Sequence, residues 1–297
     1  MRVRVLGSCA GGGLPQWNCG GANSVRARAG DPRLAAQTQT SLAVSADGVR
    51  WSLLSASPDV RQQLASFAPL HPRPGTRDVP LDTVVLTSAE LDVTLGLLVL
   101  REALSYRVLS TSWVRRALCE NDAAFRLFEP VWGTARLDES VALDREGRLE
   151  ARFFPVAPKL PTFLRDLAKP HAETTVGLRL TDRASGARLV FAPALGALDT
   201  ATLAELAAAD VRCVDGTFFR RDELWALRPG APDALAMGHV PIDGAEGSLG
   251  RLASLPGRTL YLHMNATNPI LDPDSAEAAR VRAAGIEIAS DNMELTL

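Results

Sequence analysis

The chain has 297 residues, of which 46% are hydrophobic and 22% charged, and its formal net charge is −2. These values are ordinary for a soluble globular protein, and the charge gives no reason to expect nucleic acid or an anionic membrane as a partner. The length suits one large domain or two small ones, and we expect a single domain over residues 1–297.

The four cysteines, Cys9, Cys19, Cys119 and Cys213, are scattered and form no C-x-x-C pair. Free thiols in a reducing compartment fit this pattern best. No segment approaches the roughly 18 uncharged apolar residues of a membrane span, and the N-terminus shows no apolar region of a signal peptide. We therefore expect a cytoplasmic protein. Lys159 and Lys169 are the only lysines, and arginine carries the remaining basic charge.

Short apolar segments predict strands at 3–6, 41–45, 51–55, 83–86, 107–110, 175–180, 188–191, 211–214, 259–263 and 286–289. Helical periodicity appears between them at 58–67, 95–103, 112–118, 200–208, 247–254 and 275–284. Strands alternate with helices, and some neighbouring strands have no helix between them. This order predicts an α/β sandwich with mixed sheets. The proline-rich stretches 69–80 and 154–170 are expected to be ordered surface loops at its rim.

A glycine-rich stretch, residues 7–21, follows the first predicted strand. It lacks the G-x-G-x-x-G spacing of dinucleotide-binding loops, and Pro15 interrupts any helix start. Glycine clusters are generally tight structural loops, because glycine tolerates backbone conformations that other residues avoid. In a loop of this length we nevertheless expect Gln16, Trp17 and Asn18 to project towards a binding site.

Residues 81–96 are predicted to form a buried strand, a loop and a helix that begins near Thr94. Asp92 lies just before that helix. Its carboxylate suits the N-cap position, where it would accept hydrogen bonds from free backbone N–H groups. The same carboxylate also suits a metal ion, and the two roles are compatible.

Two histidines lie where α/β folds place their sites. His239 lies in a glycine-flanked loop, and His263 ends an apolar strand. A lone histidine is more often structural, but the exits of buried strands at the rim of a sheet are the usual place for a site. We therefore expect Asp92, His239 and His263 to share a catalytic cavity.

Polar residues near other strand exits are candidates for contacts with a substrate in the same cavity. Asp215 follows the strand at 211–214, and Asp291 follows the last predicted strand. Asn265 and Asn268 come directly after His263. These four, with the glycine-loop residues named above, complete the predicted site.

Several segments closely resemble the PqqB family, the pyrroloquinoline quinone (PQQ) biosynthesis protein B. They are VLGSCAGGGLPQWNC at 5–19, ASPDVR at 56–61, GLLVLRE at 96–102, VDGT at 214–217, MGH at 237–239 and HMNATNPIL at 263–271. The resemblance implies the metallo-β-lactamase-like fold, an αββα sandwich of two mixed sheets flanked by helices. It also implies an iron- and oxygen-dependent hydroxylation of a tyrosine-derived precursor of the quinone. An older suggestion for the family is export of the cofactor.

The chain departs from the family in two places. The resemblance implies iron ligands at Asp92 and His263, but Val93 stands where the family has a third ligand, histidine. The family's structural zinc is held by Asn-Cys-x-Cys-x-x-Cys, and here Gly21 and Ser24 replace two of the thiols after Cys19. One thiol cannot hold a tetrahedral zinc, so we expect no structural zinc.

The loop 88–93 reads SAELDV, whereas zinc hydrolases of this fold carry His-x-His-x-Asp-His. Without these imidazoles, dinuclear zinc hydrolysis is not expected.

Three hypotheses for the function follow. The first is a hydroxylase-like enzyme of PQQ or related natural-product biosynthesis. The second is a metal-free carrier of the quinone or its precursor, and the third is a metal-independent acid–base enzyme. For the cofactor there are two equal alternatives, namely that the protein binds iron or that it binds no cofactor. The expected partner is a small-molecule or modified-peptide substrate, and the sequence is also compatible with a homodimer.

Overall fold

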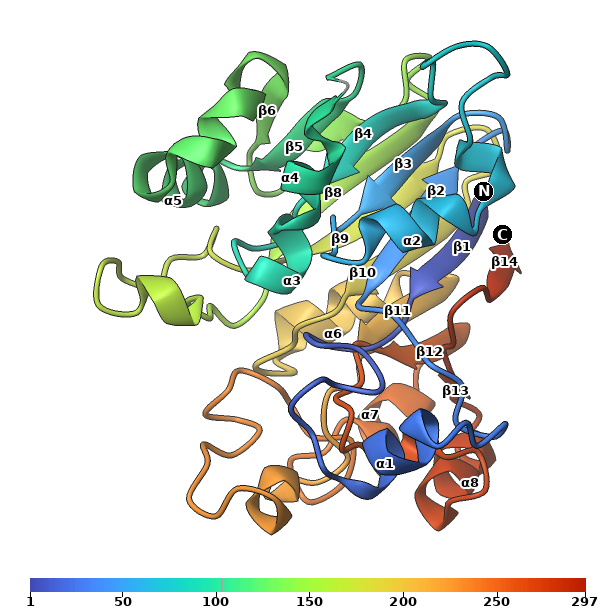
Figure 1. Cartoon of the computed structure of the whole chain (residues 1–297), viewed down its shortest axis with the longest axis vertical. Helices are drawn as coiled ribbons and strands as arrows, with labels where there is room; N and C mark the ends of the chain where they lie inside the picture. Colours follow the sequence, from blue (N-terminus) through green and yellow to red (C-terminus); the bar gives the residue numbers. More distant parts are fainter. Residues whose placement is uncertain (103) are drawn as a thin grey trace.

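Two seven-stranded β-sheets pack face to face in the computed structural model, which describes residues 1–102 and 104–297 (Figure 1). The first sheet has the order β14-β1-β2-β3-β4-β5-β6. Its strands are β1 (Arg2–Gly7), β2 (Ser41–Ser45), β3 (Trp51–Leu54), β4 (Leu81–Val85), β5 (Arg107–Thr111), β6 (Trp132–Ala135) and β14 (Glu294–Thr296).

The second sheet has the order β13-β12-β11-β10-β9-β8-β7. Its strands are β7 (Ser140–Ala142), β8 (Leu149–Pro155), β9 (Val176–Asp182), β10 (Arg188–Ala192), β11 (Val211–Asp215), β12 (Arg258–Leu262) and β13 (Glu287–Ile288). Strands β10 to β13 run parallel, whereas β8, β9 and β10 pair antiparallel. Because parallel strands end at the same edge, the polar residues that follow β11 and β12 meet there.

Apolar side chains from both sheets fill the space between them. Leu42 and Leu54 of the first sheet and Phe191, Cys213 and Leu262 of the second belong to this inner layer, and each is fully buried. Alternate residues of a strand face opposite sides of its sheet, so the same strands also carry apolar residues on their outer faces. Those outer faces bury the apolar sides of the helices.

The helices cover both outer faces (Figure 1). Apolar residues of α2 (Val60–Ala65), α4 (Gly96–Val99) and α5 (Ser112–Asn121) pack on the first sheet. Those of α6 (Thr200–Ala207), α7 (Leu249–Ala253) and α8 (Ala276–Ala283) pack on the second. The shorter helices are α1 (Ala22–Arg28), α3 (Leu91–Thr94) and the 3-10 turns η1 (Ala68–Leu70), η2 (Leu100–Glu102), η3 (Ala123–Val131), η4 (Thr162–Leu164), η5 (Glu223–Ala226) and η6 (Pro269–Leu271). The αββα sandwich expected from the sequence is confirmed.

Each of the ten predicted strands overlaps an observed one, whereas β6, β7, β8 and β14 were not predicted. Three of these four have four residues or fewer, too short for an alternating pattern to show. The fourth, β8, ends inside the stretch 154–170 that was expected to be a loop throughout. The helix expected at 95–103 is the pair α4 and η2, and its last residue lies outside the described residues. No helix that the structure describes is long and apolar enough to cross a membrane.

Candidate metal centre

The centre of the site is built where β11 and β12 end. Asp215 is the last residue of β11 and pairs with Leu262, the last residue of β12. His263 follows at once with a φ of +60°, a left-handed conformation that is uncommon outside glycine and turns the chain out of the strand. The next residue is fixed to the glycine-rich loop, since the Met264 N–H donates to the Ser8 carbonyl over 3.2 Å and the Met264 carbonyl accepts from Ala10 over 2.8 Å.

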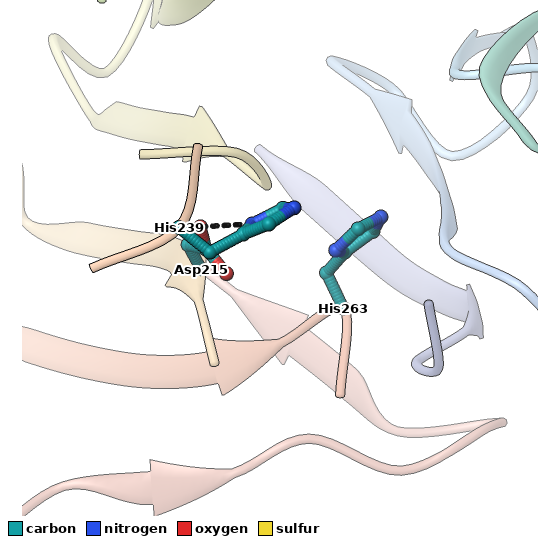
Figure 2. A group of neighbouring side chains, drawn as sticks. All are labelled: Asp215, His239 and His263. Carbon is teal, nitrogen blue, oxygen red and sulfur yellow. Dashed lines mark hydrogen bonds and ion pairs between the residues drawn. The ribbon is translucent and has the colours of Figure 1, made fainter. Parts of the chain in front are cut away.

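His239 approaches the same point from the loop between η5 and α7. Its Nδ1 atom lies 2.7 Å from Asp215 Oδ2, and its ring stacks on His263 with centroids 5.6 Å apart and an interplanar angle of 22° (Figure 2). The candidate ligand atoms of Asp215, His239 and His263 all lie within 4.8 Å of one another, and all three residues are buried. Two imidazoles and a carboxylate are a donor set that suits iron or zinc, so these residues form a candidate metal site.

One hydroxyl group connects these three side chains. Thr217 Oγ1 lies 2.6 Å from Asp215 Oδ1, 3.0 Å from His239 Nδ1 and 2.9 Å from His263 Nδ1. A hydroxyl has one proton and two lone pairs, and a carboxylate has only lone pairs. Thr217 therefore donates to Asp215 and accepts the Nδ1–H of His263, whereas the single Nδ1–H of His239 is shared between Asp215 Oδ2 and Thr217 Oγ1. This arrangement leaves the Nε2 atom of both rings for other partners.

The Nε2 atoms face Lys159 and Asp92. Lys159 Nζ lies 3.2 Å from His239 Nε2 and 3.3 Å from Glu90 Oε1. Asp92 Oδ2 lies 3.0 Å from His263 Nε2. With its Nδ1 protonated, a neutral His263 presents a lone pair to the Asp92 carboxylate, so this contact requires either a proton on Nε2 or a metal cation. Metal-bound histidines in general donate their other N–H to a neighbouring acceptor, as His263 does here to Thr217, so the residues present fit a metal ion.

Burial and charge act against each other in this site. Burial by itself would raise the pKa of Asp92, but the hydrogen bond and charge of His263 outweigh burial and lower it. The pKa of Asp215 is likewise lowered, because His239 and Thr217 outweigh the effect of burial. Burial lowers the pKa of His239, although Asp215 partly opposes this. The site therefore holds two ionised carboxylates, which favours a cation beside them.

The expectation that Asp92 caps a helix beginning near Thr94 is wrong. The helix α3 begins at Leu91, and Glu90 occupies the N-cap position without a side-chain cap. Asp92 lies inside the first turn, where its carboxylate is free to reach His263. The glycine-rich loop closes the other side, since a Cβ atom on Gly11 would lie 3.6 Å from Asp92 Oδ2.

Val93, at the position of the missing family ligand, is 7% exposed and belongs to the apolar cluster outside the first sheet. The sequence suggested a metal site reduced to Asp92 and His263. The structure brings His239 and Asp215 to this pair, since both contact the Thr217 hydroxyl group that also contacts His263. Asp215, expected to contact a substrate, is 2% exposed and bonds within the protein to Leu195 N, Thr217 and His239.

Three other predicted residues make bonds that hold the loops around the site. Asn268 is fully buried and donates to the carbonyl of Gly216. Asn265 Oδ1 accepts from Thr267. Asp291 accepts from the backbone N–H and hydroxyl groups of Ser8 and Thr38, and burial raises its pKa. None of the three has a hydrogen bond to His239 or His263 in the part of the chain that the structure describes.

The glycine-loop residues are more exposed. Trp17 is 85% exposed and Asn18 is also exposed. Gln16 is half-buried, its backbone N–H donates to Ser24 Oγ, and its side chain lies against Gly12. These residues lie on the loop whose Gly11 approaches Asp92, and their contact with a substrate stays a prediction.

Sequence reasoning missed Thr217, Glu90 and Lys159. Thr217 belongs to the VDGT string at 214–217, and its place two residues after Asp215 was the available signal. Lys159 is one of two lysines in a chain with 32 basic residues, which set it apart without indicating its position. Only the fold brings Lys159, from the loop after β8, to His239.

A model of the β-lactamase superfamily domain matches residues 50–264 of the chain. Coenzyme PQQ synthesis protein B of Rhizobium meliloti is 43% identical over 305 residues, which cover 100% of this chain and 98% of that protein. The protein of the same name from Pseudomonas protegens is 39% identical over 303 residues, which cover all of both chains.

Among solved structures, Zn²⁺-bound PqqB from Methylobacterium extorquens superposes with a TM-score of 0.94 at 37% identity, covering 100% of both chains. A diphosphatase of the PhnP family superposes with a TM-score of 0.67 at 19% identity, covering 100% of this chain and 97% of the other. The second likeness shows the shared fold alone.

Proposed function

This chain belongs to the coenzyme PQQ synthesis protein B family of the β-lactamase superfamily, and we propose that it hydroxylates a tyrosine-derived precursor of PQQ. In this reaction one oxygen atom of O₂ enters a ring C–H bond. The other leaves as water, with two electrons supplied by an external reductant. The observation that carries the proposal is the convergence of two imidazoles and two carboxylates at one edge of the sheet.

Iron is the metal that this proposal requires, and its ligands would come from Asp92 and the Nε2 atoms of His239 and His263. A bound ferrous ion would supply the one-electron chemistry with oxygen that amino-acid side chains lack. The Methylobacterium relative was solved with bound Zn²⁺, and zinc accepts the same nitrogen and oxygen donors as iron.

The chain's own residues have separate tasks in this proposal. Thr217 fixes the orientation of both rings by accepting from their Nδ1–H groups. Asp215 holds His239 through the 2.7 Å contact. Asp92, within the first turn of α3, supplies a carboxylate on the side where the Nε2 atoms point. The substrate, a small molecule or a modified peptide, would enter beside the glycine-rich loop.

A second candidate is metal-independent acid–base chemistry, and one observation favours it. Lys159, His239 and Asp215 form a chain of hydrogen bonds, with distances of 3.2 Å and 2.7 Å. Such a chain can hold a proton at His239 without any metal. The two candidates differ in whether the active protein contains iron.

Complementation tests the proposal. A PQQ-producing bacterium that lacks its own synthesis protein B should regain PQQ when it receives this chain, but not the Asp92→Asn or His263→Ala variant. The purified protein, loaded anaerobically with ferrous iron and then given precursor, oxygen and reductant, should add one oxygen atom to the precursor by mass spectrometry. Complementation by a protein that holds no iron would favour the metal-independent candidate. Absence of complementation by the parent chain would contradict a role in PQQ synthesis.

A further inference from the structure

Lys159 occupies the one free nitrogen of His239. The Nδ1 atom of this ring is engaged by Asp215 and Thr217, which leaves Nε2 with a single lone pair. Lys159 Nζ lies 3.2 Å from that atom. A lone pair that accepts a hydrogen bond from an ammonium group cannot coordinate a metal ion at the same time.

The surrounding residues hold Lys159 in this position. Its side chain is 29% exposed and pairs with Glu90 over 3.3 Å. Its backbone N–H donates to Thr175 Oγ1 over 3.4 Å, and its carbonyl accepts from the same hydroxyl over 3.1 Å. Gly238, with a φ of +79°, makes room for the lysine stem, because a Cβ atom there would lie 2.8 Å from Lys159 Cδ.

Charge explains why an ammonium group is stable here. Glu90, Asp92 and Asp215 place three carboxylates around the two histidines. Buried or half-buried carboxylates need a nearby cation. A divalent metal ion and the Lys159 ammonium group can both supply that charge, but two cations within a few ångströms repel each other strongly in a partly buried site.

We propose that Lys159 is a built-in cation that competes with a divalent metal ion for His239 Nε2, so that a metal ion uses this nitrogen only after the lysine side chain moves away. The competition concerns the same site as the proposed hydroxylation but does not rest on it. It holds for any divalent ion and for either candidate function.

The test is the affinity for Zn²⁺ alone, measured on the metal-stripped full-length chain by competition with a chromophoric chelator. Lys159→Met keeps an unbranched stem and removes the charge, so it should bind Zn²⁺ at least about tenfold more tightly than the parent. Lys159→Arg keeps the charge and should bind as the parent does. Lys169→Met removes the only other lysine, an exposed residue of the same segment, and should also match the parent.

Two further measurements keep the test decisive. Adding Asp92→Asn to Lys159→Met should abolish the gain, which locates the ion at this site. If circular dichroism shows that Lys159→Met does not fold, Lys159→Gln replaces it in the affinity measurement. Equal affinities of the parent and the neutral variant, including no binding by either, would overturn the proposal, and so would a gain that survives Asp92→Asn. Because no turnover is measured, this result is independent of whether the chain supports PQQ synthesis.

Discussion

At the scale of single residues, the site depends on a few polar atoms with no spare bonding capacity. The Thr217 hydroxyl group donates one hydrogen bond, to Asp215, and lies within accepting distance of the Nδ1 atoms of His239 and His263. One donor and two acceptor positions are the full capacity of a hydroxyl group. Each imidazole thereby has a fixed tautomer, and each Nε2 atom faces a charged partner. Such a network is sensitive to the loss of any one member, because the remaining buried groups lose their partners together.

Thr217→Val tests this sensitivity with a side chain of nearly the same shape. In the variant, Asp215 Oδ1 keeps only the hydrogen bond from the backbone N–H of residue 217. The His263 Nδ1–H loses its acceptor, whereas the His239 Nδ1–H keeps Asp215 Oδ2. We expect the free energy of unfolding to fall by about 1–3 kcal/mol in urea denaturation. Thr181→Val is the control, since Thr181 is a half-buried β9 residue whose hydroxyl makes no hydrogen bond with the described residues. Equal stability of the two variants would contradict the assigned network.

Val93→His tests the missing family ligand. The variant should bind ferrous iron more tightly than the parent in an anaerobic titration, because the new imidazole is a third ligand beside Asp92 and His263. It should also lose stability, about 1–3 kcal/mol, since Val93 packs in an apolar cluster. Val99→His, a substitution at an exposed valine of α4, is the control and should bind iron as the parent does. Equal binding by Val93→His and the parent would show that this position does not face the metal site.

At the scale of elements, two loops around the site are joined by a buried carboxylic acid. Glu223, the first residue of η5, accepts from Phe219 N over 2.6 Å, and its Oε1 lies 2.5 Å from Thr267 Oγ1. Thr267 also lies 3.0 Å from Asn265 Oδ1. The single hydroxyl proton of Thr267 cannot be donated to both Glu223 Oε1 and Asn265 Oδ1. When Glu223 is protonated, it donates to Thr267, and Thr267 donates to Asn265. Burial raises the pKa of Glu223 to about 7, although Thr267, Phe219 and Arg220 lower it in part.

Glu223→Gln should change how stability depends on pH. The folded-state pKa of about 7 lies above the ordinary glutamate pKa of about 4.5. The stability that protonated Glu223 contributes is therefore complete below about pH 4.5 and is lost as the pH rises to about 7. Over this window the parent should lose about 3 kcal/mol relative to the variant, because glutamine stays neutral. Urea denaturation from pH 4.5 to 8 measures the difference. A constant difference across that range would refute the link to Glu223.

The glycine-rich loop lacks the thiols for a zinc ion. Cys19 Sγ accepts the Gly21 backbone N–H over 3.3 Å, and Ser24 Oγ accepts from Gln16 N. We expect Cys19→Ser to leave the zinc content of the purified protein unchanged in elemental analysis. Cys119→Ser, at a buried cysteine of α5, is the control. About one zinc ion per chain that disappears only with Cys19→Ser would show a structural zinc after all.

At the scale of the whole molecule, the apolar layer between the sheets supports the edge where the site lies. Strands β11 and β12 carry Asp215 and His263 at their ends and bury Cys213 and Leu262 in that layer. Loss of packing there should therefore affect stability far more than loss of an equal side chain at the surface.

Phe191→Ala and Phe163→Ala make this comparison. Phe191 of β10 is fully buried between the sheets, whereas Phe163 is 41% exposed. The first variant should lose about 3–5 kcal/mol in urea denaturation, and the second should lose much less, within about 0.5–1 kcal/mol. Similar losses would mean that the inter-sheet layer is not the main source of stability.

The sequence by itself determined the pattern of strands and helices, because period-two and period-3.6 apolar spacing follows from local backbone geometry. It also singled out Asp92, His239 and His263, since polar residues at strand exits need no knowledge of distance to be noticed. It did not determine that Asp215 is a partner of His239 rather than of a substrate, or that Lys159 reaches the same ring. Those contacts join residues 24 and 80 positions apart. Only the parallel pairing of β11 with β12 and the path of the loop after β8 bring them together, because side chains this far apart in the chain meet through packing of the whole fold and not through local spacing.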